Sequence, residues 1–222
     1  IIEGWNWRQL KAALAANPNL KHDASILSEA DLAAALQLPV SSVEGQFFPD
    51  TYYLSKGGSE RHLLERAHRL LARKLDAAWQ QRSPGLPLQN PQQVLILASL
   101  VEKETGKPDD RPMIAGVFLN RLNIGMRLQT DPAVIYGLGE AFDGNLTRVH
   151  LQTDTPYNTY TRAGLPPSPI ALPGRAALHA ALHPAEGRAL YFVARGDGSS
   201  QFSETLDQHN QAVRRYILGK KD

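Results

Sequence analysis

The most informative stretch of the sequence is Val94-Leu95-Ile96-Leu97-Ala98-Ser99-Leu100-Val101, followed at once by Glu102-Lys103-Glu104-Thr105. Asn90-Pro91 upstream supplies a cap and a first helical position, and Gly106 supplies a stop, so we predict one helix over this stretch. Residues 94–101 are apolar around the whole circumference of this helix, and we therefore expect it to be buried on all sides. A helix buried until its last turn delivers that turn to the wall or floor of a cleft.

The last turn of this helix carries two candidate acids. Glu102 should lie against apolar surface, where desolvation raises the pKa of a carboxyl and the negative end of the helix dipole acts in the same direction. A carboxyl that stays protonated near neutral pH is what a general acid requires. Glu104 has nearly the same claim, and the spacing does not choose between them. Both could instead form solvated ion pairs with Lys103 and Lys107.

Caps and stops outside this stretch predict further helices and one hairpin. A strand over residues 189–194, a turn over 196–199 and a returning strand over 200–203 make a small, mostly antiparallel sheet. The fold class is therefore predicted as α+β with helices dominant. Residues 125–173 are rich in Gly, Pro, Thr, Asn and Tyr, which is typical of a functional segment. The other helices are predicted over residues 7–16 (cap Asn6), from Ser28 to Pro39, over 60–81 (cap Ser59), 110–125, 131–136 and 204–218.

Composition excludes several classes of function. The 222 residues contain no cysteine, so no disulfide or thiolate metal site can form. The net charge is +2 without a long basic run, which disfavours a nucleic-acid binder. No apolar run is long enough to span a membrane, and the start at Ile1 without methionine suggests that any targeting segment has been removed.

Metal, nucleophile and phosphate motifs are also missing. His179 and His183 stand four residues apart on a predicted helix, but no carboxylate accompanies them as in a zinc protease, so we interpret them as helix surface. No serine elbow and no phosphate-binding loop is present. We therefore expect neither a metal nor a cofactor.

The irregular segment contains two polar motifs with competing interpretations. Asp131-Pro132 is typical of a helix cap followed by a first helical position, which favours a structural role over a catalytic one. Tyr157-Asn158-Thr159-Tyr160 combines amide, hydroxyl and aromatic groups, a mixture that suits sugar binding. The same residues could merely organise a turn.

Four ordered segments resemble the YceG-like endolytic murein transglycosylases, the MltG family. The resemblance covers about residue 42 to the end, and Tyr191-Phe192-Val193 and Phe202 in the closing hairpin also fit it. The four segments are Ala98–Thr105; Val43-Glu44-Gly45 with Phe48–Tyr52; Asn120–Leu122 with Met126–Pro132 and Val134–Gly137; and Tyr157–Tyr160 with Gly164–Pro167 and Pro173-Gly174.

The resemblance implies a catalytic residue at the first acidic position of Glu-Lys-Glu-Thr, which is Glu102 here. Members of the family carry an N-terminal membrane anchor and a LysM-like lobe ahead of the catalytic part. Residues 1–41 are accordingly predicted as a helical join to such a lobe, and residues 42–222 as the catalytic domain. The resemblance also implies a location on the periplasmic face of the bacterial inner membrane and peptidoglycan synthases as partners.

The reaction that the family resemblance implies is nonhydrolytic cleavage of the β-1,4 bond between N-acetylmuramic acid and N-acetylglucosamine in peptidoglycan glycan strands. The C6 hydroxyl of the muramoyl ring is the nucleophile, so a single acid and base suffices and a 1,6-anhydro end forms. Two alternatives remain open: a muramidase in which Asp131 assists Glu102, and a noncatalytic glycan-binding scaffold. The residues predicted to line the cleft and orient the sugar are Gln129, Asp131, Tyr136, Asn158 and Tyr160.

Overall fold

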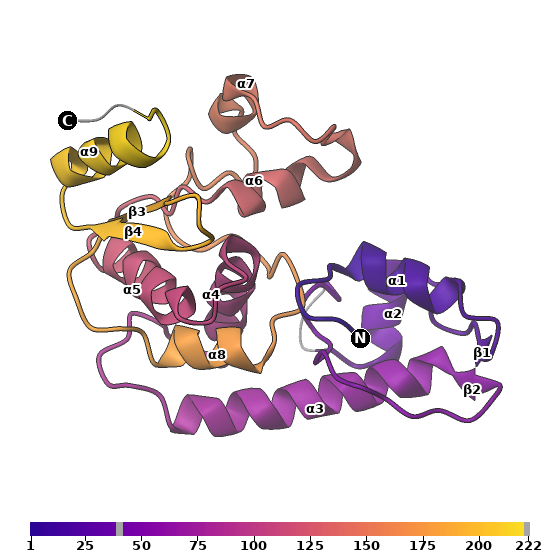
Figure 1. Ribbon diagram of the computed structural model, residues 1–222. Helices are drawn as coiled ribbons and strands as arrows, with labels where there is room; N and C mark the ends of the chain where they lie inside the picture. Colours follow the sequence, from indigo (N-terminus) through magenta and orange to yellow (C-terminus); the bar gives the residue numbers. More distant parts are fainter. Residues whose placement is uncertain (39–41, 220–222) are drawn as a thin grey trace.

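A computed structural model describes residues 1–38 and 42–219 and shows two lobes that share one long helix (Figure 1). The shared helix α3 (Glu60–Gln80) runs along the base of both. The N-terminal lobe contains α1 (Trp7–Ala15), β1 (Leu20–Lys21), α2 (Glu29–Ala35) and β2 (Gly58–Ser59). The larger lobe contains α4 (Pro91–Glu104), α5 (Asp110–Asn123), α6 (Asp131–Leu138), the short 3₁₀ turn η1 (Gly139–Ala141), α7 (Arg148–Gln152), α8 (Arg175–Leu182), β3 (Tyr191–Ala194), β4 (Ser200–Ser203) and α9 (Leu206–Tyr216).

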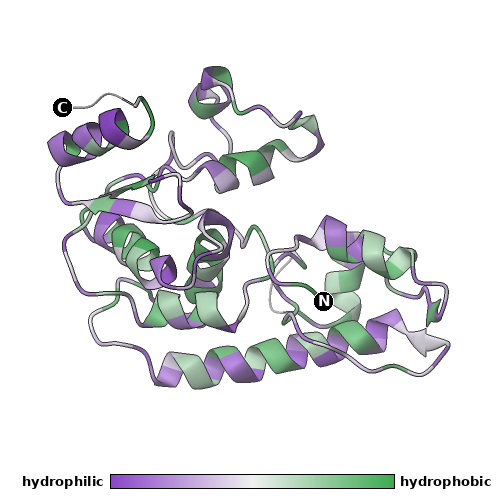
Figure 2. Cartoon of the chain, viewed as in Figure 1, coloured by the Kyte–Doolittle hydropathy of each residue, from purple (hydrophilic) through white to green (hydrophobic). Residues whose placement is uncertain are grey.

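Helix α4 forms the centre of the larger lobe, as predicted. All eight residues from Val94 to Val101 are buried, and α3, α5, α6 and α8 pack around the helix. The side chain of Asn90 caps it by accepting a hydrogen bond from the Gln93 amide at 3.0 Å. The apolar character of α4 and α8 contrasts with the polar outer helix α9 in Figure 2. The last turn of α4 therefore has a fixed position, because every preceding turn is packed in the core.

Helix α3 contributes to two separate hydrophobic clusters. Its first half places Leu63 and Leu64 in the cluster of the N-terminal lobe, with Trp7 and Phe47. Its second half places Leu71 and Leu75 in the cluster built around α4. With 21 residues, α3 is about 32 Å long. One rigid element thus links the packing of the two lobes.

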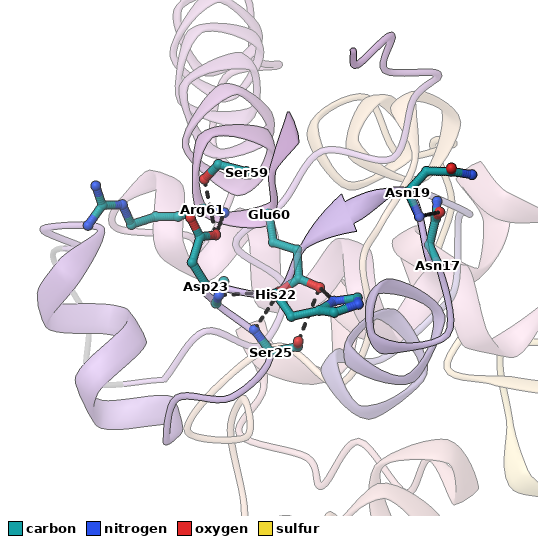
Figure 3. A network of polar contacts seen from close by, with 9 residues as sticks. Asn17, Asn19, His22, Asp23, Ser25, Ser59, Glu60 and Arg61 are labelled. Atoms are coloured by element: carbon teal, nitrogen blue, oxygen red, sulfur yellow. Dashed lines mark hydrogen bonds and ion pairs between the residues drawn. The ribbon is translucent and has the colours of Figure 1, made fainter. Parts of the chain in front are cut away.

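A buried carboxylate fixes the start of α3. Glu60 is completely buried and accepts hydrogen bonds from the Ser25 amide at 2.8 Å, the Ala24 amide at 3.2 Å and the His22 ring at 2.6 Å (Figure 3). Burial alone would raise the pKa of Glu60, but these hydrogen bonds outweigh it and hold that pKa below its usual value. Since the donors precede Glu60 by more than 30 residues, the network ties the loop after β1 to the shared helix.

The predicted α+β class is confirmed, with corrections in detail. Asn6, Ser28 and Ser59 cap helices as expected, and β3 pairs antiparallel with β4 over 200–203. Helix α2 ends at Ala35, and its predicted end at Pro39 lies outside the described residues. Three features were not predicted: α7, the 3₁₀ turn η1, and the parallel pairing of β1 with β2. The boundary between residues 41 and 42 stays a prediction.

Candidate active site

A cleft of about 370 Å³ opens where α4 ends. Its walls come from the C-terminal turn of α4, the segment that leads into α6, the loop after α7, and the unit formed by β3 and α9. These segments are far apart in the sequence, and the cleft exists only because the fold assembles them. The lining residues are Glu104, Arg121, Gln129, Asp131, Tyr160, Tyr191, Phe192, Leu206 and His209.

Glu104 is the carboxyl of α4 that faces this cleft. Burial raises its pKa to about 7, and the negative charge of Asp131 adds to the rise. The Thr130 hydroxyl, which donates to Glu104 Oε1 at 2.5 Å, and the charge of Arg121 act in the opposite direction. A carboxyl with this pKa keeps a substantial protonated fraction at neutral pH, which a general acid requires.

Glu102 does not line this cleft, and the catalytic role predicted for it from the sequence stays a prediction. Its side chain is 7% exposed, and its carboxylate accepts a hydrogen bond from the Gly174 amide at 2.9 Å. Arg111 Nη2 lies 3.7 Å from the same carboxylate. Burial does raise the pKa of Glu102, as predicted, although the Gly174 bond and Arg111 partly oppose it. These contacts join α4 to α5 and to the start of α8.

Arg121 connects two walls of the cleft, the segment before α6 and the segment before β3. Its Nε donates to the Leu190 carbonyl at 2.6 Å, and its Nη1 donates to the Leu128 carbonyl at 2.6 Å. The guanidinium also lies 5.4 Å from the centre of the Tyr191 ring. Arg121 is buried, and burial lowers its pKa from the ordinary value. The sequence had not marked this residue as functional beyond its place in a motif.

A strained turn presents Gln129 and Asp131 to the cleft. Gln129 has a φ of 49°, a left-handed conformation that favours glycine and costs about 1 to 2 kcal/mol for other residues. The turn is held because the Gln129 amide donates to the Thr159 carbonyl at 3.1 Å and the Thr130 amide donates to Thr159 Oγ1 at 2.9 Å. Strain of this kind is typical of functional sites that the surrounding structure holds in place.

Asp131 and Tyr160 form a polar pair in the same cleft. The Tyr160 hydroxyl donates to Asp131 Oδ1 at 2.6 Å. Burial, followed by this hydrogen bond, raises the pKa of Tyr160, so its hydroxyl remains a donor. The expectation that Asp131 caps α6 was wrong by one position, because Thr130 occupies the cap and makes no side-chain cap bond there.

Asn158 lies in the motif beside the cleft but is completely buried. Its amide nitrogen donates to the carbonyls of His150, Leu151 and Thr153, the last at 2.6 Å. Its Oδ1 accepts from the Tyr160 amide at 2.9 Å. The turn-organising role therefore accounts for all of its contacts, and it acts on the cleft through Tyr160.

Tyr136, like Glu102 and Asn158, does not line the cleft. Its hydroxyl donates to Glu44 Oε2 at 3.1 Å, and its ring meets Tyr157 edge-on with the centres 4.9 Å apart. Glu44 also accepts from the Trp7 amide, so this cluster joins α6 to the N-terminal lobe. Burial raises the pKa of Glu44 to about 7. The structure thus brings together Gln129, Asp131 and Tyr160 and leaves Tyr136 at the junction of the lobes.

The cleft offers acid–base chemistry with a polar and aromatic wall. In residues 1–38 and 42–219, no group of three or more His, Asp or Glu side chains is arranged to hold a metal ion. One half-buried carboxyl faces a cavity lined by a second carboxylate, an amide, phenols and aromatic rings. Such groups can protonate a leaving oxygen and hold sugar hydroxyls.

Comparisons with known proteins give a consistent result. The sequence profile of the YceG-like family matches residues 1–215. The chain is 46% identical over 129 residues to an endolytic murein transglycosylase of Bacillus subtilis strain 168, covering 58% of this chain and 36% of that protein. It is 31% identical over 185 residues to an endolytic murein transglycosylase of Streptococcus pneumoniae strain D39, covering 80% of this chain and 33% of the relative. A yceG-like protein of Listeria monocytogenes has a crystal structure that superposes with a TM-score of 0.79 at 32% identity, covering 95% of this chain and 74% of that one. The chain spans about a third of the length of the curated relatives.

Proposed function

The chain belongs to the YceG-like family, and from this premise we propose that it is a lytic transglycosylase that cuts peptidoglycan glycan strands with Glu104 as acid and base. The observation that carries the proposal is the half-buried carboxyl of Glu104, with its raised pKa, opening onto the cleft. The names of two relatives from different genera agree with this activity. Endolytic cutting, within strands, would terminate or release nascent glycan.

The proposed reaction needs one proton donor that later accepts a proton. Glu104 protonates the glycosidic oxygen as the bond from C1 of the muramoyl residue breaks, and the N-acetylglucosamine end leaves as an alcohol. The C6 hydroxyl of the same muramoyl residue forms the new bond to C1 and gives its proton to the Glu104 carboxylate. The product carries a 1,6-anhydro ring, and the carboxyl is again protonated. Because the nucleophile belongs to the substrate, proximity replaces a second catalytic side chain.

The remaining groups of the cleft would orient the sugar. The Gln129 amide and the Asp131–Tyr160 pair supply donors and acceptors for hydroxyl and acetamido groups, while Tyr191 and Phe192 supply apolar faces. Asn158 and Tyr136, predicted from the sequence to bind substrate, are proposed here to support the cleft indirectly, through Tyr160 and through the junction of the lobes.

The decisive experiment compares Glu104→Gln with Glu102→Gln on purified glycan strands. Glu104→Gln should lower turnover by about 10²- to 10⁴-fold, the usual contribution of acid–base catalysis, and should retain glycan binding. Glu102→Gln is the matched control, two residues away on the same helix, and its amide oxygen can still accept the Gly174 bond. It should keep most of the activity. The opposite result would return the catalytic role to Glu102, as the sequence first suggested.

The chemistry of the product separates the two alternative functions. A muramidase in which Asp131 assists the acid would leave reducing-end muramic acid, one water heavier than the anhydro product, so mass spectrometry of the digest distinguishes the reactions. Detection of hydrolytic ends alone would overturn the transglycosylase proposal. A noncatalytic scaffold would yield no cleavage and would keep its cellular effect in the Glu104→Gln variant.

Location and partners form a further part of the proposal. Peptidoglycan lies outside the cytoplasm, so an enzyme that cuts it works there, and we propose the periplasmic face of the inner membrane with peptidoglycan synthases as partners. Among the helices of the described residues, none is both long and apolar enough to cross a bilayer. Protease accessibility of the native protein in spheroplasts tests the location, and co-purification with synthases tests the partnership.

A further inference from the structure

A second concave surface shares no lining residue with the cleft at the end of α4. It is a groove of about 600 Å³ between α3 and α8, which lie alongside each other at the base of the larger lobe (Figure 1). Apolar side chains line its inner part, among them Leu70, Ala78, Leu178 and Leu182. None of the residues of the proposed active site lines it. We call this surface the basic groove, for the charges described next.

Basic side chains surround the apolar part of this groove. They are Arg73 and Lys74 on α3, and Arg175, His179 and His183 on or just after α8. Among the described residues no Asp or Glu lines the groove, and Asp76, the one acid in this part of α3, is exposed elsewhere. The whole chain has a net charge of only +2, so this local excess is not a general property of the molecule.

The basic groups repel one another and lack acidic partners in the groove. The rings of His179 and His183 lie 4.5 Å apart, and burial together with the charge of His179 lowers the pKa of His183. Lys74 Nζ lies 5.0 Å from the centre of the Phe48 ring, an aromatic contact rather than an ion pair. An acidic ligand would relieve this repulsion, so the charge pattern favours an anionic occupant.

The shape of the groove matches a helix. On α3 the lining residues recur every three or four positions from Leu70 to Gln81, and on α8 and its end they do so from Arg175 to His183. The α3 side therefore extends over three turns, about 16 Å. Two helices lying side by side form a channel into which the ridge of a third helix can pack. The apolar groups are recessed between the helices, which does not suit the flat surface of a bilayer.

We propose that the basic groove binds an acidic amphipathic helix of a partner protein. The apolar stripe of that helix would lie on Leu70, Ala78 and Leu178, and its Glu or Asp side chains would meet Arg73 and Lys74 on one rim and Arg175 on the other. The proposal is independent of the reaction at Glu104, because the groove and the cleft share no lining residue.

A binding assay with designed peptides tests the proposal. The probe is a fluorescent peptide of about 18 residues, long enough to form a helix, with Leu at positions i, i+3, i+4 and i+7 and Glu on its other faces. A peptide with Lys in place of Glu and a scrambled acidic peptide are the controls. Fluorescence anisotropy with the whole chain should show binding of the acidic amphipathic helix and neither control.

Exposed positions allow matched variants that leave the core unchanged. Arg73→Glu and Ala77→Glu, both on the groove side of α3, should weaken binding by at least about tenfold, since each places a negative charge against the acidic helix. Ala72→Glu, on the same helix but outside the groove, and Arg214→Glu, on α9, should bind as the unchanged chain does. Circular dichroism of each variant should match that of the unchanged chain, which would show that all four are folded.

Three results would overturn the proposal. The first is equal binding of the scrambled acidic peptide, which would indicate charge attraction alone. The second is equal weakening by Ala72→Glu and Ala77→Glu, which would place the contact elsewhere on α3. The third is binding to phosphatidylglycerol vesicles, lost in Arg73→Glu, without binding of the peptide, which would assign the groove to the membrane surface.

Discussion

At the scale of single residues, the site depends on which of two neighbouring carboxyls faces the cleft. Glu102 and Glu104 lie on the same helical turn, and burial raises the pKa of both. Their contacts differ: Gly174 and Arg111 hold Glu102 at a structural junction, whereas Thr130 holds Glu104 beside the cavity. Catalysis requires access to substrate as well as a raised pKa, and only the surrounding fold supplies that access.

The pH dependence of turnover provides a prediction at this scale. In the proposed mechanism the free enzyme acts through protonated Glu104, whose pKa burial raises to about 7. We therefore expect kcat/KM to fall above about pH 7, approaching tenfold for each further pH unit. Initial rates of glycan cleavage between pH 5 and 9 measure this.

Glu44 supplies the control for that measurement, because burial raises its pKa to about 7 as well. Glu44→Gln should leave the alkaline fall in kcat/KM unchanged. If the fall disappears in this variant, the titrating group is Glu44 and the assignment to Glu104 is wrong.

The sequence predicted the acidic turn, and the choice between its two carboxyls is the part that the fold bears on. The apolar run of α4 was enough to indicate a buried helix that ends at a cleft and raises carboxyl pKa values. The choice between Glu102 and Glu104 depends on Arg111, Thr130 and Gly174, whose positions follow from tertiary packing. Local spacing carries no information about those contacts, and the motif resemblance pointed to the first carboxyl.

At the scale of elements, caps and periodicity in the sequence predicted most helices, whereas the shortest helix and strands were not predicted. The caps Asn6, Ser28, Ser59 and Asn90 act through local hydrogen bonds, which a sequence can reveal. Strands β1 and β2 have two residues each and pair across 38 positions, so no alternation of polar and apolar residues marks them. Helix α7 has only five residues, too few for a periodic pattern.

The loop that follows α7 yields a prediction at this scale. Asn158→Ala removes a buried side chain that satisfies three backbone carbonyls and one amide. The three carbonyls and the amide would then lack a hydrogen-bond partner, which should lower the free energy of unfolding by about 3 kcal/mol, measured by urea denaturation. Activity should fall as well, because Tyr160 loses the support of its amide.

Asp154→Ala is the matched change for that loop. Asp154 pairs with Arg162 at 2.8 Å on the surface of the same loop, where both side chains are more than half exposed. Solvent screens such a pair, so its loss should change stability and activity little. Full activity in Asn158→Ala would show that the loop tolerates disorder and would remove its proposed supporting role.

At the scale of the whole molecule, a buried carboxyl lies where the lobes meet. Glu44 accepts from the Trp7 amide of α1 and from the Tyr136 hydroxyl of α6, so it contacts both lobes. Its pKa is about 7 in the fold, against 4.5 for the free side chain. The folded state therefore binds the proton more tightly than the unfolded chain does.

This difference predicts how stability depends on pH. Protonated Glu44 makes its full contribution to the free energy of unfolding below about pH 4.5. As the pH rises from there to about 7, Glu44 ionises in the unfolded chain but stays protonated in the fold, so this contribution is progressively lost. Between pH 5 and 8 the loss is on the order of 3 kcal/mol for a shift of this size. Glu44→Gln should flatten the pH dependence of urea unfolding by that amount. Parallel curves for the two proteins would contradict the assignment.

The continuity of α3 restricts how the molecule can move. A hinge needs a few residues that can change their backbone angles. Helix α3 offers none between the two lobes, since its residues from Glu60 to Gln80 are all helical. The unit of β3, β4 and α9 is attached differently: α9 packs chiefly on the hairpin, and the hairpin meets α5 along β3. That unit carries Tyr191, Phe192, Leu206 and His209 of the cleft. A glycan strand would accordingly enter the cleft by movement of the unit of β3, β4 and α9 relative to the two lobes, which α3 holds together.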